Sequence, residues 1–282
     1  MLIYKIARYC TERRACEMEF ELISSRENRI VKSVRKLMAS ASYRRQTGLF
    51  LLEGLRLSVD AVQNGYTVET VIVTEKMSED DRIQPIYDTA KQRIMVTDAL
   101  FKYICDTVNP QGVLCIVKIP NTVFSADSIS SGRYIMLENT ADPANLGAIA
   151  RTAEALGISG LIIGSAGCDP FSPKSQRAAM GALLRLPLFI CGDCLQTVEA
   201  LKTRGFSVFA SIVSGEAEDL SLTDFPRNSV ALIGNEANGL TAGTVNAANR
   251  RITIKMSGRA ESLNAAAAAA IIMWQMTKAG GK

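Results

Sequence analysis

Three polar segments of the chain carry the residues whose types and spacing suit chemistry. The first, DPANLGAIARTAEALG, holds Asn145 and Arg151; the second, LIGNEANGL, holds Glu236; the third, SLN, holds Ser262 and Asn264. Side-chain amides can hold a ligand through hydrogen bonds, and a guanidinium is always charged and clamps anions. These three loops are therefore where chemistry is to be sought.

Each segment also has a purely structural interpretation. Arg151 can form a surface ion pair with Glu154, three residues further along the same helix. Asn and Gly also suit an ordinary turn, in which Glu236 simply caps a backbone group. Ser262 is expected to be the N-cap of the last helix, and Asn264, just inside that helix, has an amide free to hold something.

The composition excludes several kinds of chemistry. The 282-residue chain has no histidine, which removes Ser-His-Asp triads, histidine metal sites and the usual general base near neutral pH. Its seven scattered cysteines are not a disulfide framework and fit a reducing cytoplasm. Cys191 and Cys194 suggest a redox or zinc pair, but no second pair completes a four-ligand site, so we expect no metal.

Other classes are also disfavoured by the sequence. At 48% hydrophobic and 21% charged residues, the chain is typical of a soluble globular protein. The longest apolar run, Ala265 to Trp274, is far short of the roughly 20 residues of a membrane span, and the N-terminus lacks a secretory signal. No G-x-G-x-x-G fingerprint follows a predicted strand, so a nicotinamide or flavin enzyme is not expected. The sequence also has no P-loop motif, so a P-loop enzyme is not expected either.

The elements around the three segments predict an α/β fold. Short apolar strands alternate with helices, and in the second half they are expected at residues 134–137, 161–163, 188–190, 208–212, 230–233 and 252–254. This alternation predicts a parallel sheet with helices on both faces, whose ligands lie at the carboxyl ends of the strands. Asp142 as N-cap and Pro143 after it predict a helix start in the first segment.

The basic side chains are concentrated near the N-terminus. Residues 1–50 hold 11 basic and 5 acidic side chains. From Ser25 onward the apolar spacing predicts one basic amphipathic helix, either a solvated face or an arm for a nucleic acid. The residues expected to contact RNA phosphates there, with Tyr43 offering a stacking surface, are Arg26, Arg29, Lys32, Arg35, Lys36, Arg44 and Arg45.

In their order and spacing, the three segments resemble the motifs of the SpoU (TrmH) class of RNA 2'-O-ribose methyltransferases. The first motif corresponds to Asn145 followed six residues later by Arg151, the second to GNEANGL, and the third to I-x-M-x-G followed by SLN. The stretch SPKSQRAAMGALLRLPL is also similar to the family. The resemblance covers residues 130–280 and, more loosely, 25–118, which resembles a ribosomal-protein-like substrate-binding domain.

The resemblance implies a fold, a cofactor and a partner. The fold is an α/β methyltransferase domain with a C-terminal trefoil knot, and the family works as a homodimer in which each active site draws on both chains. S-adenosylmethionine is expected to bind at Gly234, Ile254 and Leu263, with Ile233, Met256 and Asn264 nearby. Residues 1–20 are then an extension, 21–118 the RNA-binding domain, 119–132 a linker and 133–282 the knotted domain.

The implied reaction is methyl transfer to a ribose 2'-hydroxyl of structured RNA, with ribosomal RNA favoured. Arg151 is expected to clamp a phosphate and stabilise the developing alkoxide, since a guanidinium cannot act as a base. The substrate phosphate could accept the proton, Glu236 is the alternative base, and Asn145, Ser262 and Asn264 hold the nucleotide and the loops. Arg56 is a further residue expected to face RNA. Transfer RNA as substrate and a non-catalytic knotted RNA-binding protein are the alternatives.

Overall fold

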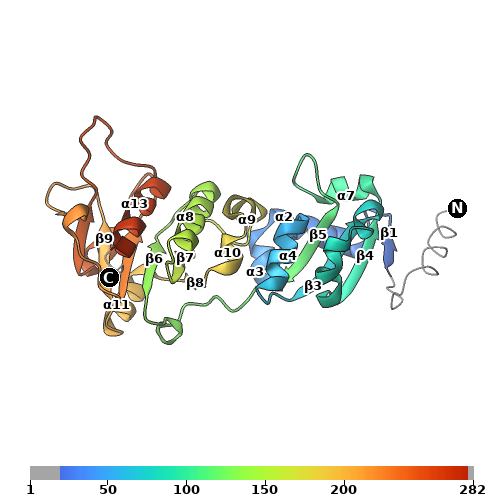
Figure 1. The fold of residues 1–282 in the computed structure, drawn as a ribbon, viewed down its shortest axis with the longest axis horizontal. Coiled ribbons are helices and arrows are strands. Elements are labelled where there is room, and N and C mark those ends of the chain that lie inside the picture. The colour runs from blue at the N-terminus through green and yellow to red at the C-terminus, as the bar shows by residue number, and fades with distance from the viewer. Residues whose placement is uncertain (1–19, 279–282) are drawn as a thin grey trace.

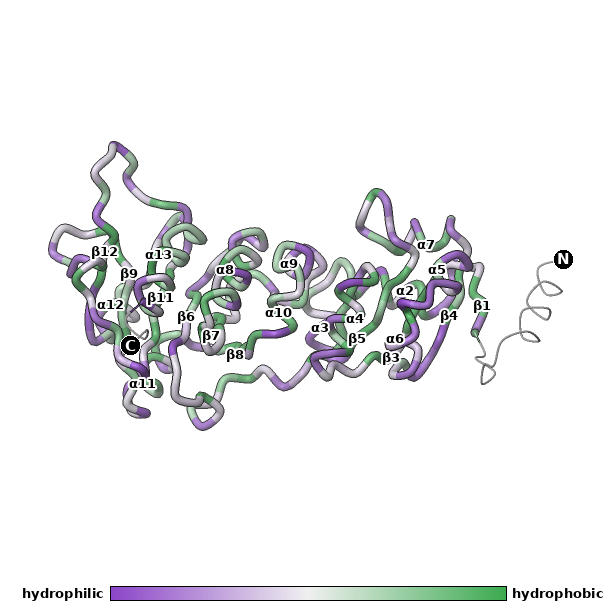
Figure 2. Tube along the Cα trace, in the orientation of Figure 1, coloured by the Kyte–Doolittle hydropathy of each residue, from purple (hydrophilic) through white to green (hydrophobic). Residues whose placement is uncertain are grey.

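Two β-sheets with flanking helices lie one after the other along an elongated molecule (Figure 1). The coordinates are a computed structural model, which describes residues 20–278. The predicted extension 1–20 and the cysteines at positions 10 and 16 therefore fall almost wholly outside the described residues. Apolar stretches follow most strands of both sheets, and polar residues lie on the helices as well as in the loops (Figure 2).

The N-terminal domain has a mixed sheet in the order β1-β4-β3-β5-β2. β5 runs antiparallel to both of its neighbours, β3 and β2, whereas β1 and β3 run parallel to β4. Its elements are β1 (Glu21–Ile23), α2 (Arg29–Ala39), α3 (Ala41–Thr47), β2 (Leu49–Glu53), α4 (Leu55–Gln63), β3 (Val68–Thr74), α5 (Glu75–Ser78), η1 (Asp81–Ile83), α6 (Gln84–Thr89), β4 (Gln92–Val96), α7 (Asp98–Ile104) and β5 (Val113–Lys118).

The single basic helix expected from Ser25 onward is two helices, so that prediction was wrong. Ser40 ends α2 in an extended conformation and at once caps α3, because its hydroxyl accepts a hydrogen bond from the Tyr43 backbone N–H at 3.1 Å. A serine favours such a cap over a helix interior. Arg26 lies before α2, whose own N-cap is Asn28.

The C-terminal domain has a fully parallel seven-stranded sheet in the order β10-β12-β9-β11-β6-β7-β8, which confirms the predicted parallel sheet. Its elements are β6 (Arg133–Leu137), α8 (Pro143–Ala155), β7 (Gly160–Gly164), α9 (Pro173–Ala179), α10 (Ala182–Arg185), β8 (Leu188–Cys191), α11 (Cys194–Thr203), β9 (Ser207–Ser211), β10 (Glu218–Asp219), η3 (Leu220–Leu222), β11 (Ser229–Ile233), α12 (Ala242–Ala247), β12 (Arg250–Thr253) and α13 (Ala265–Lys278).

The two domains share a packed junction built by residues 169–185. Phe50 of β2 packs against Phe171 with ring centroids 5.1 Å apart, and one continuous apolar cluster joins the two cores. Arg44, whose side chain is 5% exposed, donates from Nε to Asp169 Oδ2 at 2.7 Å and from Nη1 to the Leu37 carbonyl at 2.5 Å. Burial of this charge is tolerable because it is paired and hydrogen-bonded.

The segment 119–132, predicted to be a linker, is attached to both domains. The Ile119 N–H donates to the Gly48 carbonyl at 2.8 Å, while Thr122 and Phe124 exchange backbone hydrogen bonds with Ile190 of the edge strand β8. Its backbone therefore extends the C-terminal sheet locally instead of spanning open solvent.

Candidate active site

The three motif segments follow strands that are close neighbours in the C-terminal sheet. The first motif comes after β6, the second after β11 and the third after β12; β6 pairs with β11, and β9 separates β11 from β12. Because the strands are all parallel, their carboxyl ends meet at one edge of the sheet. The fold thus brings together side chains that lie more than a hundred positions apart.

The first motif begins α8 as predicted. Asp142 is the N-cap, its Oδ1 accepts from the Ala144 N–H at 2.9 Å, and Pro143 occupies the first helical position. Asn145 follows in the first turn and is 8% exposed. A buried amide must find hydrogen-bond partners, so the surroundings of Asn145 determine what this part of the site can do.

A hydrogen-bonded chain of three side chains joins the three motifs. Asn145 Nδ2 donates to Glu236 Oε1 at 2.7 Å, and Asn264 Nδ2 donates to Asn145 Oδ1 at 3.0 Å. Asn145 thereby uses its donor on the second motif and its acceptor on the third. The structure thus brings together three of the five residues predicted to be catalytic, and we call them the Asn145–Glu236–Asn264 chain.

Asn264 has a structural role that the sequence analysis assigned to Ser262. Its Oδ1 accepts from the Ala266 and Ala267 N–H groups at 2.9 and 3.3 Å, so Asn264 is the N-cap of α13 and the expected cap at Ser262 was wrong. Asparagine is as good a cap as serine, and α13 begins only at Ala265. The amide nitrogen, which the cap does not use, is the group that reaches Asn145.

The second motif forms a tight turn whose backbone is fixed by Asn235. The Asn235 and Gly239 backbones exchange two hydrogen bonds at 3.0 and 2.9 Å, and Asn235 Nδ2 donates to the Asn139 carbonyl at 2.8 Å. Only glycine fits at position 234 without a shift of the backbone, because a Cβ there would lie 2.2 Å from the Gly239 carbonyl carbon. The turn therefore lies close against the first motif.

Glu138 is a positioning residue that the sequence analysis missed. It is 4% exposed, and its carboxylate accepts from the Thr241 N–H and hydroxyl at 2.9 Å each and from the Thr244 hydroxyl at 2.8 Å. These bonds attach the end of β6 to the start of α12, directly after the second motif. An acidic residue at the end of an apolar strand was the available signal, since a buried carboxylate needs several donors.

A cavity of about 400 Å³ opens between the second and third motifs. Of the six residues predicted to bind the cofactor, Ile233, Gly234, Ile254, Met256 and Leu263 line it, whereas Asn264 does not. The volume is within the range of small-molecule sites. Among the lining residues that the structure describes, Glu236 alone carries a charge, so the cavity is nearly neutral apart from one carboxylate at its edge.

The environment of Glu236 sets its protonation. Burial raises the pKa of Glu236, but hydrogen bonds from Asn145 and from nearby backbone N–H groups outweigh it, so the pKa lies below the ordinary value. Hydrogen bonds to the charged form favour that form. Glu236 is therefore a carboxylate at neutral pH and a weaker base than a free glutamate.

Arg151 is exposed on α8 and lies apart from the Asn145–Glu236–Asn264 chain. The surface ion pair with Glu154 expected as its structural alternative is not formed. Glu154 instead accepts from Arg185 Nη2 at 2.8 Å, and within residues 20–278 Arg151 makes no ion pair or side-chain hydrogen bond. Its guanidinium is thus available to a phosphate.

The predicted RNA-contacting residues of α2 and α3 are mostly engaged within the domain. Arg44 is buried at the junction with Asp169, so the prediction that it contacts RNA was wrong. The guanidinium groups of Arg26 and Arg35 stack on Tyr103 at 4.5 and 4.8 Å from the ring centroid. The exposed cations of this face that remain are Arg29, Lys32, Lys36 and Arg45, of which Lys32 pairs with Glu27 and Lys36 lies over Tyr43.

The cysteine pair that suggested a redox or zinc motif bears on the functional class, as do metal-binding clusters and membrane-spanning helices. Cys191 and Cys194 lie at the β8–α11 junction with Sγ atoms 3.9 Å apart. Over the described range 20–278, no cluster of three His, Cys, Asp or Glu side chains is arranged to hold a metal. Nor does any helix in that range have the length and apolar character to cross a membrane.

The comparisons with known proteins agree with this geometry. Residues 132–274 match the SpoU rRNA Methylase family, and residues 28–115 match the MRM3-like substrate binding domain. The chain therefore belongs to the SpoU rRNA methylase family. The parallel-sheet α/β methyltransferase fold and an N-terminal substrate-binding domain, both expected from the sequence, are confirmed.

Individual relatives extend over nearly the whole chain. It is 29% identical to the 23S rRNA (guanosine(2553)-2'-O)-methyltransferase RlmP of Bacillus subtilis, over 90% of this chain and 98% of that protein. It is 28% identical to the 23S rRNA (uridine(2479)-2'-O)-methyltransferase of Streptomyces viridochromogenes, over 91% of each. The AdoMet-bound rRNA methyltransferase from Sinorhizobium meliloti superposes with a TM-score of 0.83 at 28% identity, over 93% of this chain and 99% of that one.

Proposed function

We propose that this protein transfers a methyl group from S-adenosylmethionine to a ribose 2'-hydroxyl of ribosomal RNA. The observation that carries the proposal is the Asn145–Glu236–Asn264 chain, which ties all three motifs together beside one cavity. The relatives from Bacillus subtilis and Streptomyces viridochromogenes are named for 2'-O-methylation of 23S rRNA, which supports ribosomal RNA over transfer RNA.

The cavity suits S-adenosylmethionine on chemical grounds. Ile233, Ile254, Met256 and Leu263 offer an apolar slot for the adenine ring, and the absence of a side chain at Gly234 lets the second motif fold tightly on its own backbone beside this slot. The bound donor supplies an electrophilic methyl group on a positively charged sulfur. Glu236, the charged residue of the lining, is anionic and therefore favours a cationic ligand.

In this proposal Arg151 acts on the RNA and Glu236 acts on the loops. A guanidinium beside the ribose stabilises the negative charge that develops on the 2'-oxygen and holds the adjacent phosphate, which accepts the proton. Glu236 is a poor base because hydrogen bonds lower its pKa, so we assign it the positioning of Asn145. Ser262, exposed at the edge of the cavity, is assigned to the nucleotide.

The proposal includes a homodimer in which Arg151 serves the site of the partner chain. Two observations support it: Arg151 is exposed and lies apart from the cavity of its own chain, and α13 presents exposed apolar side chains. On α13, Trp274 is 61% and Ile271 is 42% exposed, and their spacing of three places them on one helical face. Exposed apolar groups of this size favour a protein contact.

Further features of the fold belong to the same proposal. The C-terminal segment is proposed to form the trefoil knot that the family resemblance implies, and the packing of α13 against α8, β6 and β11 is compatible with it. The N-terminal domain is proposed to be of the ribosomal-protein-like type, with a predicted boundary at residues 119–132. A cytoplasmic location is proposed from the scattered cysteines.

The test is methyl transfer by the purified protein. Labelled S-adenosylmethionine is incubated with total RNA from cells that lack the gene, and the nucleosides are analysed by mass spectrometry. A new 2'-O-methylnucleoside in ribosomal RNA is the expected result, and analytical ultracentrifugation of the same sample should give a dimer. Donor binding without any labelled RNA would overturn the assigned reaction, and absence of donor binding would overturn the assigned cofactor.

A further inference from the structure

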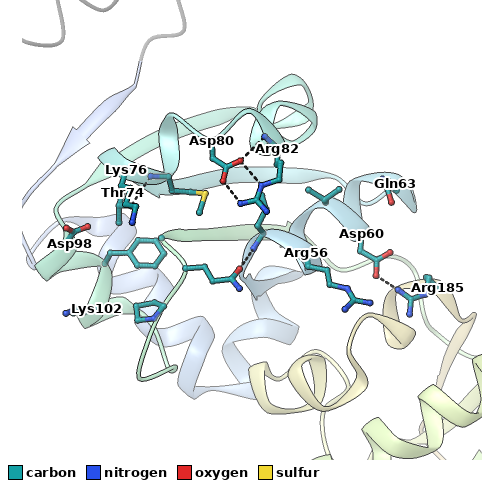
Figure 3. A pocket seen from close by; sticks show the side chains of 17 residues that line it. Arg56, Asp60, Gln63, Thr74, Lys76, Asp80, Arg82, Asp98, Lys102 and Arg185 are labelled. Atoms are coloured by element: carbon teal, nitrogen blue, oxygen red, sulfur yellow. Dashed lines mark hydrogen bonds and ion pairs between the residues drawn. The ribbon is translucent and has the colours of Figure 1, made fainter.

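A second cavity, larger than the one at the active site, lies away from that site. It measures about 1080 Å³ and lies in the N-terminal domain, between α4, the start of α5, the start of α7 and residues 110–112 (Figure 3). We call it the α4–α7 groove. Among the cations that line it, Arg56 alone was expected from the sequence to face RNA.

The walls of the groove are fixed by backbone and side-chain hydrogen bonds. Gln111 Oε1 accepts from the Leu55 N–H at 3.0 Å, and the Gly112 carbonyl accepts from the Thr74 N–H at 2.9 Å. A side chain at Gly112 (φ +86°) would place its Cβ 2.6 Å from Thr74 Oγ1, so only glycine fits there. The groove is therefore a built feature of the domain.

The charges that line the groove separate into paired and unpaired groups. Asp80 pairs with Arg82, and Asp60 pairs with Arg185. Among the lining residues that remain, Arg56, Lys76 and Lys102 are exposed and form no ion pair with any residue from 20 to 278, and the one acid besides the pairs is Asp98. An excess of positive charge thus faces the open space (Figure 3).

Ion pairs connect the α4–α7 groove to helix α8 of the C-terminal domain. Arg185, a lining residue from the C-terminal domain, contacts both Asp60 of α4 and Glu154 of α8, the helix that also carries Asn145 and Arg151. The packed junction at residues 169–185 holds this connection in place. A polymer lying in the groove would therefore be presented to the catalytic domain in a fixed orientation.

We propose that the α4–α7 groove binds the phosphate backbone of the RNA substrate, with Arg56, Lys76 and Lys102 as the contacting cations. The inference rests on the proposed function and adds the place at which the substrate is anchored. RNA fits the observations because three unpaired cations line a cavity of about 1080 Å³, and phosphate is the ligand for which scattered exposed cations suffice. The predicted cations of α2 and α3, by contrast, are partly engaged with Tyr103, Tyr43, Glu27 and Asp169.

The test compares two lysine pairs of the same domain. K76A/K102A removes two cations that line the groove, of which Lys76 follows the end of β3. K91A/K118A removes exposed lysines at the start of β3, where the Lys91 and Lys118 N–H groups donate to the Val68 and Thr67 carbonyls and Lys91 Nζ pairs with Glu69 at 2.8 Å. Both variants lose two positive charges, and Lys76 lies roughly 20 Å along the strand direction from the start of β3. A transcript of large-subunit ribosomal RNA is the probe, and filter binding at several salt concentrations gives affinity and salt slope.

We expect K76A/K102A to weaken RNA binding about tenfold or more at 0.15 M salt and to reduce the salt slope by about 0.9 for each lost phosphate contact. K91A/K118A should stay within about twofold of the wild type, and K76R/K102R should restore binding because it keeps the charge. In methylation assays, the KM for RNA should rise while kcat changes little. Equal weakening by both lysine pairs, or none by either, would overturn the assigned groove.

The outcomes also separate this inference from the proposed function. A wild type that binds and methylates the transcript, with K76A/K102A indistinguishable from K91A/K118A, overturns the groove alone. A wild type that binds RNA but methylates nothing overturns the reaction, while the comparison of affinities still decides the groove. Unchanged thermal unfolding and S-adenosylmethionine affinity in the variants would exclude misfolding as the cause of weak RNA binding.

Discussion

Two cavities of this molecule, the one between the second and third motifs and the α4–α7 groove, differ in size and in charge. The cavity between the second and third motifs measures about 400 Å³ and has one charged lining residue, while the α4–α7 groove measures about 1080 Å³ and has eight. A small, nearly neutral cavity suits one compact ligand, whereas a wide cationic groove suits part of a polyanion. The binding of the methyl donor and the binding of RNA should therefore respond differently to salt and to mutation.

The strongest test of this separation is Arg151→Ala. We expect methyl transfer to fall by about a hundredfold or more, because the proposed role of the guanidinium is to stabilise charge that develops in the transition state. Isothermal titration should find S-adenosylmethionine affinity within about twofold of the wild type. Arg151→Lys, which keeps the charge but loses the fork of donors, should recover a small part of the rate. Substantial activity in the alanine variant would contradict the assigned role.

The junction between the two regions is tested by Arg44→Met. This change leaves Asp169, whose side chain is 16% exposed, without its partner, and we expect a loss of about 3 kcal/mol in the free energy of unfolding. Chemical denaturation gives the value. Combining Arg44→Met with Asp169→Asn should recover part of the loss, because no charge then stays buried. A cost below about 0.5 kcal/mol would mean that solvent reaches the pair.

Gly234→Ala tests the smaller cavity by itself. A Cβ at this position would approach the Gly239 backbone to 2.2 Å, so the second motif must move. We expect the affinity for S-adenosylmethionine to fall about tenfold, which corresponds to about 1.4 kcal/mol. RNA affinity should stay unchanged, since the groove is in the other domain. A matched control is Gly215→Ala, where the added Cβ has no atom within 4 Å.

The smallest expected effect concerns pH and the Asn145–Glu236–Asn264 chain. Because the pKa of Glu236 is lower in the folded protein, its carboxylate stabilises the fold above the ordinary glutamate pKa, and this contribution is lost as pH falls through the lowered value. The thermal midpoint of the wild type should therefore fall relative to that of Glu236→Gln between about pH 5 and pH 3. Parallel pH profiles for the two proteins would argue against the lowered pKa.

The sequence predicted the catalytic domain well because its signals are local. Asp142 and Pro143 start α8 by short-range hydrogen bonding, and the parallel strands follow from unbroken apolar runs. Ile233, Gly234, Ile254, Met256 and Leu263 line one cavity, as the family resemblance implied. Asn145, Glu236 and Asn264 meet because the strands before them are close neighbours in the sheet.

What the sequence could not predict depends on contacts between distant segments. Arg44 has the same local surroundings as the exposed Arg45, and only the packing of Asp169 against it shows that one is buried. Glu154 is three residues from Arg151 but pairs with Arg185, which comes from another helix. The antiparallel β5, the cap at Asn264 and the groove cations Lys76 and Lys102 likewise depend on tertiary neighbours.

The bond between Asn264 and Asn145 has a consequence for biosynthesis. During translation Asn145 emerges 119 residues before the partner that accompanies it in the finished site. Until Asn264 arrives, the Asn145 carbonyl oxygen lacks its donor and α13 lacks its cap, so the Asn145–Glu236–Asn264 chain of a nascent protein is incomplete. Enzymatic competence is thus acquired late, after nearly the whole polypeptide has been made, and a prematurely terminated product would be inert.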